Sequence, residues 1–199
     1  MMHFDPNLPP FTLRVASEVP RAERCAAIAE AMQATGLLET PAPAAAQRWI
    51  ETFVDAYGDG LETAADAVPI VRELRAEAVI VPALELERLR NRQVLFFLDT
   101  VSQYVDDQPE LRGLPLEADL GEISSEFGLA PEEALGAARM ALTGRPDGPP
   151  LHLLFPLLGH DRIMMRIGAI NSHLLHGRGL EPIKYGPDGE PFKTLGMKT

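Results

Sequence analysis

The stretch that decides the fold reads RMALTGRPDGPPLHLLFPLLGHDRIMMRI, residues 139–167. Its pattern predicts the end of one helix, a constrained loop and two further helices. Gly144 can take a positive φ after the first helix, and the pair Pro149-Pro150 stiffens the exit from the loop. Gly159 is expected to end the second helix, so that the third begins at His160. This part of the chain is therefore predicted to be helical, with one rigid loop.

The same helical pattern continues on the N-terminal side of this stretch. The expected segments are 21–35, 42–57, one from Leu61 that Pro69 kinks or divides, a longest helix from Pro82 to about Asp107, and shorter helices after Pro115 and Pro131. The apolar residues of the longest segment recur with the helical period, and alternation typical of a strand is missing. The sequence predicts an all-α fold, a superhelical bundle of two packed subdomains.

The expected subdomains have boundaries at prolines, glycines and changes in composition. Residues 1–20 form an irregular N-terminal segment and 21–110 a first helical subdomain. Residues 111–176 form a second helical subdomain, and 177–199, which contain every lysine, form a flexible tail. Turn-forming and helix-breaking residues in the last segment favour a terminus with few contacts.

Length and composition narrow the class of protein. The chain has 199 residues, 46% of them hydrophobic, which suits a domain that buries a core. It has no apolar run of the ~20 residues that span a bilayer, and no secretory pattern at its N-terminus. Its single cysteine, Cys25, excludes an internal disulfide and is expected to be a buried, inert thiol. We expect a cytoplasmic protein with no membrane or metal partner.

Charge is distributed unevenly along the chain. The net charge is −11, but residues 1–133 hold 10 basic and 24 acidic side chains, whereas residues 134–199 hold 8 basic and 5 acidic ones. Binding to nucleic acid requires local cations, because released counterions supply much of the affinity. Only the C-terminal third could provide a basic surface for such a partner.

The loop after Gly144 has two readings from the residues alone. It can be a plain connection between helices, which composition favours. It can also present guanidinium groups and an apolar edge to unstacked bases, as proteins that read single-stranded RNA loops do. Arg139 likewise can pair with Glu132 or Glu133 on its own helix, or face a ligand.

The motifs of this stretch are Arg139-x-Ala-Leu-Thr-Gly144, a four-residue spacer, Pro149-Pro150-Leu151, and a downstream Leu-Gly followed by Arg162 and Arg166. In these motifs and their spacing the chain resembles the C-terminal, anticodon-binding region of bacterial glutamyl-tRNA synthetases. The resemblance is firm over 134–167 and looser over 22–175. It includes residues 49–66, with their Thr63-x-x-Asp66 step.

The resemblance implies two helical subdomains that grip the anticodon loop of a tRNA. An arginine at the position of Arg139 would contact an anticodon base, and Pro149 and Leu151 would pack against the RNA loop. The residues that we predict to bind RNA are Arg139, Thr143, Arg145, Pro149, Pro150, Leu151, Arg162 and Arg166. The implied partner is the anticodon loop of glutamate tRNA.

Catalytic signatures are missing from the sequence. It contains neither the His-Ile-Gly-His and Lys-Met-Ser-Lys-Ser motifs of class I synthetases nor a phosphate-binding glycine loop. We therefore predict no catalytic residue and no cofactor. His152, His160, His173 and His176 are close in sequence but lack carboxylates or cysteines at metal-ligand spacing, so surface or partly buried histidines are favoured over a metal site.

Two functions follow as hypotheses. The first is a non-catalytic tRNA-binding domain that assists aminoacylation in trans, with a synthetase as protein partner. The second is a protein-interaction or regulatory domain that kept the fold and lost the RNA. The second is motivated by the acidic residues 1–133 and by Glu62 at a position that is usually basic in the family. A further departure from the family pattern is Ala137-Ala138 in place of the usual Pro-Leu.

Overall fold

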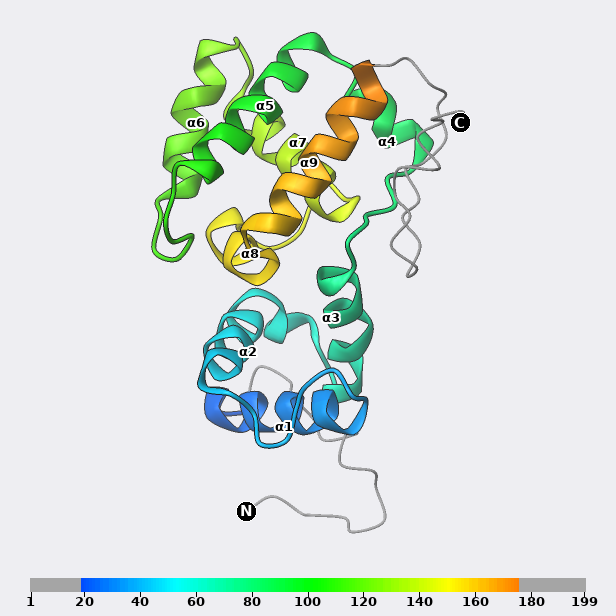
Figure 1. Ribbon diagram of the computed structural model, residues 1–199, viewed down its shortest axis with the longest axis vertical. Helices are drawn as coiled ribbons and strands as arrows, with labels where there is room; N and C mark the ends of the chain where they lie inside the picture. Colours follow the sequence, from blue (N-terminus) through cyan, green and yellow to red (C-terminus); the bar gives the residue numbers. More distant parts are fainter. Residues whose placement is uncertain (1–18, 176–199) are drawn as a thin grey trace. The chain divides into compact units, whose positions relative to one another are not determined.

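The computed structural model describes residues 19–175. All the regular secondary structure in this part of the chain is helical, with no strand (Figure 1). The α-helices are α1 (Arg21–Ala34), α2 (Ala44–Tyr57), α3 (Ala67–Arg75), α4 (Ala83–Arg88), α5 (Arg92–Asp106), α6 (Leu116–Glu126), α7 (Pro131–Thr143), α8 (Leu151–Leu158) and α9 (His160–Leu175). Two short 3-10 turns, η2 (Gly58–Gly60) and η3 (Ala64–Asp66), lie between α2 and α3. The predicted all-α class is confirmed. The irregular start and the tail at 177–199 fall, apart from residues 19–20, outside the described residues.

The chain divides into two compact units between Leu74 and Arg75. The boundary expected from the sequence was at residue 110, after the long segment that follows Pro82. It differs because α5 packs against α9 and α7, so α5 belongs to the core of the second unit. The first of these partners, α7, begins 25 residues after α5 ends, and α9 begins 54 residues after it, so the local pattern carries no signal of them.

The first unit is built on the apolar faces of α1, α2 and α3. Ile28 and Met32 of α1, Phe53 of α2 and Val71 of α3 are each 0% exposed. Cys25 is only partly buried, which corrects the expectation of a buried thiol; burial still raises its pKa. The core of this unit therefore consists of the residues that recur at helical spacing.

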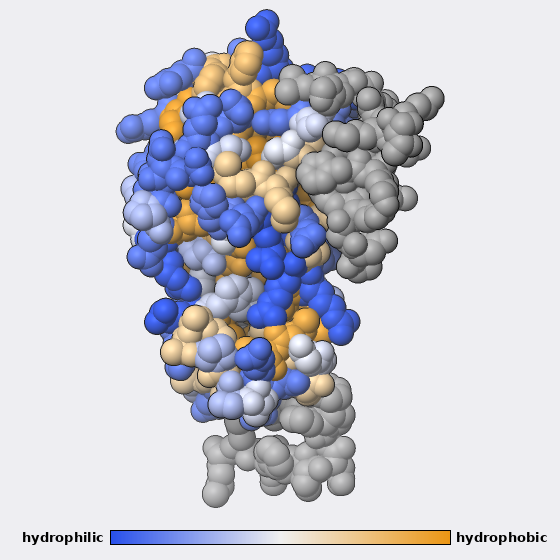
Figure 2. Space-filling model, in the orientation of Figure 1, coloured by the Kyte–Doolittle hydropathy of each residue, from blue (hydrophilic) through white to orange (hydrophobic). Residues whose placement is uncertain are grey.

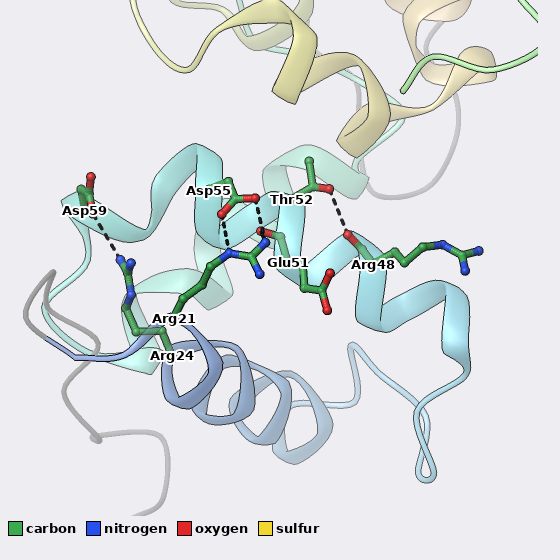
Figure 3. Close-up of polar contacts among 7 residues, drawn as sticks. All are labelled: Arg21, Arg24, Arg48, Glu51, Thr52, Asp55 and Asp59. Carbon is green, nitrogen blue, oxygen red and sulfur yellow. Dashed lines mark hydrogen bonds and ion pairs between the residues drawn. The ribbon is translucent and has the colours of Figure 1, made fainter. Parts of the chain in front are cut away.

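Polar contacts on the surface of the first unit connect α1 to α2 and to the turn after it (Figure 3). Arg21 donates two hydrogen bonds to the Asp55 carboxylate, at 2.7 and 2.8 Å. Arg24 pairs with Asp59 at 3.2 Å. The hydrogen bonds from Arg21 lower the pKa of Asp55, so the carboxylate stays charged. Two arginines of this unit are thus already occupied by carboxylates.

The resemblance over residues 49–66 ends at a capping box. The Asp66 carboxylate accepts the backbone N–H of Thr63 at 2.8 Å and its hydroxyl at 3.0 Å. Such reciprocal bonds satisfy backbone donors that the start of a helix leaves without partners. The hydrogen bond from the Thr63 N–H lowers the pKa of Asp66. Thr63 and Asp66 therefore set the entry to η3 and α3, and α3 accommodates Pro69 in its first turn.

The second unit surrounds α5. Phe97, Leu98 and Val101 are 0% exposed and lie in a helix that packs against α6, α7 and α9. The predicted helix from Pro82 to Asp107 is wrong in one respect: it is two helices, α4 and α5. The Asn91 side chain accepts the Gln93 N–H at 2.9 Å and caps α5. The apolar period continues across this break, which is why the sequence pattern conceals it.

The hydroxyl of a half-buried tyrosine joins α5 to α6. The Tyr104 hydroxyl donates a hydrogen bond to the Asp119 carboxylate. Burial and this bond raise the pKa of Tyr104 to about 12. Because the folded state favours the neutral phenol, its contribution to stability is present below the ordinary value of 10 and is lost as pH rises through 12.

We therefore expect Tyr104 to ionise at about pH 12 and Asp119→Asn to lower its pKa towards 10. The difference in ultraviolet tyrosinate absorbance between the wild type and Tyr104→Phe isolates this one group during a pH titration. An unchanged titration in Asp119→Asn would show that the carboxylate does not hold the phenol neutral.

Candidate nucleic-acid interface

The candidate site is the loop at residues 144–150, between α7 and α8 in the second unit. Gly144 ends α7 with φ 77°, and its N–H donates to the Met140 carbonyl at 2.9 Å. The Thr143 hydroxyl donates to the Arg139 carbonyl at 2.9 Å and accepts the Arg145 N–H at 3.4 Å. Thr143 therefore shapes the start of the loop with its own side chain.

Arg139 braces the other end of the same loop. Its Nε–H donates to the Pro149 carbonyl at 3.2 Å, and the side chain is half-buried. The sequence offered Glu132 or Glu133 as the partner of Arg139. In the structure its partner is this carbonyl of the loop. This hydrogen bond uses the Nε–H of Arg139 and fixes the position of the Pro149 carbonyl relative to α7.

The predicted RNA-binding residues of the loop differ in exposure. Arg145 and Pro150 are exposed and Pro149 is half-buried, whereas Leu151 is 0% exposed in the core beneath the loop. Leu151 and its neighbour Pro150 begin α8, because proline before a helix needs no amide partner there. The structure thus places Arg145, Pro149 and Pro150 on the surface, with Leu151 as the anchor below them.

Arg162 and Arg166 lie on α9 and do not belong to the exposed surface of the loop. Arg162 donates from Nε to the Arg75 carbonyl at 3.1 Å and from Nη1 to the Leu158 carbonyl at 3.3 Å. Arg166 is 1% exposed and donates to the carbonyls of Leu142 and Ala76. A guanidinium buried to this extent has no surface for RNA. Arg166 therefore joins the end of α7 to the segment that follows Arg75.

That segment, residues 76–82, lies against the loop and was missed by sequence reasoning. A Cβ on Gly144 would stand 2.2 Å from the Ile80 carbonyl oxygen and 3.6 Å from Val79. Val79 and Val81 are 6% and 0% exposed, whereas Ile80 between them is 61% exposed. The available signal was three β-branched residues before Pro82, which favour extended backbone over helix.

One carboxylate stands at the start of α8. Glu117 of α6 accepts the His152 backbone N–H at 3.3 Å and contacts His152 Nδ1 at 2.9 Å. Burial opposes the ionisation of Glu117, but these hydrogen bonds outweigh it and lower its pKa. The backbone N–H of His152 and the amides at the start of α8 favour the charged form of the carboxylate. Glu117 is therefore a structural cap beside the loop.

Arg162 also lies close to Arg75, whose carbonyl it bonds just before the 76–82 segment. Burial, and then the positive charge of Arg162, lower the pKa of Arg75. The two like charges therefore oppose each other at this point of the second unit.

The described residues form neither a metal-binding cluster nor a membrane-spanning helix. Across residues 19–175, no three histidine, cysteine, aspartate or glutamate side chains gather in a way that could hold a metal ion. His173 is buried and His176 lies beyond the described range, so the two do not form a described pair. None of the described helices is both long and apolar enough to cross a bilayer.

Comparison with known proteins identifies the family of the chain. Residues 21–170, which include every helix up to most of α9, match the anticodon binding domain family. The chain belongs to this family, and the match covers both units.

The relatives that the chain matches are glutamate–tRNA ligases. The chain is 25% identical over 122 residues to a glutamate–tRNA ligase 2 of Caldanaerobacter subterraneus subsp. tengcongensis, covering 61% of the chain and 25% of that protein. It is 31% identical over 139 residues to a glutamate–tRNA ligase of Mycolicibacterium vanbaalenii, covering 65% of the chain and 25% of the relative. With that of Roseiflexus castenholzii the identity is 42% over 59 residues, which is 30% of the chain and 12% of the ligase.

The chain spans about a quarter of the length of the first two relatives. The resemblance noted in the sequence is therefore confirmed as one to the anticodon-binding region of glutamate–tRNA ligases.

Proposed function

We propose that this chain binds the anticodon loop of a tRNA, with glutamate tRNA as the preferred partner. The observation that supports this most directly is the Arg139–Pro149 brace. It holds a proline-stiffened loop in one conformation, with Arg145 and Pro150 exposed on it. A loop that is already ordered binds RNA without the entropic cost of ordering it first.

The roles within the loop follow from exposure and hydrogen bonding. Arg139 keeps its Nη groups for a base or phosphate while its Nε holds the loop. Arg145 supplies positive charge, and Pro149 and Pro150 present an apolar face to an unstacked base. Thr143 and Leu151 act from below, by shaping the start of the loop and anchoring its end. In this proposal Arg162 and Arg166 position the scaffold and do not touch the RNA.

The domain would act in trans, on a tRNA that another polypeptide aminoacylates. The chain carries none of the class I catalytic signatures, and its matched relatives are synthetases four times the length of the aligned part. We propose that it supplies tRNA binding to an aminoacylation reaction catalysed by another polypeptide. Addition of the chain to a glutamate–tRNA ligase that lacks its own anticodon-binding region should then lower the KM for tRNA.

Arg139→Ala is expected to weaken binding of a glutamate tRNA transcript by about tenfold or more, since a charge-assisted hydrogen bond contributes ~1.5–3 kcal/mol. The loss arises from the missing guanidinium and from release of the Pro149 carbonyl. Fluorescence titrations of the transcript at two salt concentrations measure both affinity and the number of phosphate contacts.

Arg88→Ala is the matched control, because Arg88 is an exposed arginine of α4 paired with Glu85. It removes the same charge from the same unit and should change affinity little. Equal losses in the two variants would indicate a general charge effect. Failure of the folded wild type to bind tRNA at low salt would refute the proposal.

A second function is favoured by the surface of the first unit. Residues 19–74 contain nine carboxylates and four arginines. Of those arginines, Arg21 and Arg24 are paired with Asp55 and Asp59 (Figure 3). Glu62 is exposed where the family usually has a basic residue. We therefore propose, as the alternative, a regulatory domain that binds a basic protein surface. Binding to a ligase but not to tRNA in parallel titrations would select it.

A further inference from the structure

Large apolar side chains reach the surface of the second unit at a few positions. Figure 2 shows hydrophobic residues interspersed among hydrophilic ones on this surface. The exposed large hydrophobic residues of the described chain are Ile80 at 61%, Leu84 at 71%, Phe96 at 49% and Met165 at 37%. Ile80 differs from the other three because its backbone lies directly against the candidate loop.

The contact between Ile80 and the loop is fixed by geometry. The Ile80 carbonyl oxygen occupies the space where a Cβ on residue 144 would stand, at 2.2 Å. The segment and the end of α7 therefore meet backbone to backbone at Gly144. Arg145 is the residue that follows Gly144, so exposed residues of the loop and of the segment flank this contact.

The segment is held in place from beneath. Val79 and Val81 are buried on either side of Ile80, so the extended backbone directs the middle side chain outward. The Arg166 guanidinium bonds both the Ala76 carbonyl of the segment and the Leu142 carbonyl of α7. The β-branched Ile80 side chain has few rotamers, so it loses little entropy when it is covered.

We infer that the 76–82 segment forms a second wall of the RNA site, beside the first wall that the loop at residues 144–150 provides. In this arrangement Ile80 packs against the face of an unstacked base of the anticodon loop. This inference rests on the proposed tRNA-binding function and assigns it a specificity residue outside the family motifs. An exposed aliphatic surface adjoining an arginine-bearing, proline-stiffened loop offers the two contacts that unstacked bases use, an apolar face and a cation.

The inference predicts an apolar contact that carries no charge. Ile80→Ala, in the full chain, should weaken binding of a glutamate tRNA anticodon stem-loop about fivefold. The dependence of affinity on salt should stay unchanged, because no phosphate contact is lost. Arg145→Ala should instead reduce the salt dependence. Since Ile80 is exposed, its truncation is expected to leave the fold intact, which amide hydrogen exchange can check.

The partner base can be located with abasic stem-loops. We expect one abasic position in the anticodon loop to remove the difference between the wild type and Ile80→Ala, since the contact is then already lost. Leu84→Ala is the control: it shortens an aliphatic side chain on α4 that is 71% exposed, against 61% for Ile80, and should bind like the wild type.

The outcomes separate this inference from the proposed function. If Ile80→Ala binds like the wild type while Arg139→Ala binds weakly, the function stands and the second wall is wrong. An equal loss in Leu84→Ala, or a loss that persists with every abasic stem-loop, also overturns it. If the wild type binds no stem-loop and no full tRNA, the proposed function itself fails.

Discussion

Gly144→Ala is expected to lower the free energy of unfolding of the second unit by about 3 kcal/mol or more, the larger part of it from a steric clash. The residue has φ 77°, a left-handed conformation that costs an L-residue ~1 kcal/mol or more. Its new Cβ would also stand 2.2 Å from the Ile80 carbonyl oxygen. That neighbour is backbone held by buried valines, so it cannot rotate away. Either α7 or the 76–82 segment must shift.

Gly113→Ala is the matched control for this substitution. Gly113 has φ 74° in the same unit, and a Cβ there would meet nothing within 4 Å. It should therefore show the conformational cost alone, about 1 kcal/mol. Urea unfolding followed by circular dichroism, with hydrogen exchange of α7 and α9 amides to localise the effect, measures both variants. Equal losses would mean that the contact with Ile80 is looser than the geometry indicates.

The second large effect is expected for Arg166→Met, which keeps the apolar stem and removes the guanidinium. The two hydrogen bonds to the carbonyls of Leu142 and Ala76 are charge-assisted, each of ~1.5–3 kcal/mol, and both carbonyls would lose this donor. We expect a loss of about 3 kcal/mol in the stability of the second unit. Binding of tRNA should weaken in parallel, because the wall and the loop would no longer be tied together.

Two further variants test this explanation. Arg166→Lys keeps the charge but cannot reach two carbonyls at once, so it should be nearly as destabilised as Arg166→Met. Arg162→Met removes an arginine of the same helix that is only half-buried, and should cost less than about 1 kcal/mol. A stable Arg166→Met would show that the cost of burying the guanidinium cancels its hydrogen bonds.

Gly144 and Arg166 both determine the shape of the candidate site. Gly144 permits the close approach of the 76–82 segment, and Arg166 holds that approach from inside. Both belong to the motif that first indicated RNA binding, and in the proposed interface both position the loop and the 76–82 segment without contacting the RNA. On this proposal the motif contains residues that position the contact surface as well as residues that form it.

Much of the fold could be predicted because its signals are local. The glycine after α7, the prolines at residues 149 and 150, and the recurring apolar residues specify where helices begin and end within a few residues. The break between α4 and α5 was missed because the apolar period runs across it, and only the Asn91 cap marks the new start. The motif spacing over residues 139–167 was sufficient to indicate the family.

The sequence by itself determined the all-helical class, the position of the loop and the identity of the family, since each depends on residues near one another in the chain. Only the tertiary structure decided the boundary after Leu74, the burial of Arg166 and the place of Ile80 beside Gly144. These depend on contacts between residues 24 to 90 positions apart. No periodicity reports such contacts, because they are set by how whole helices pack.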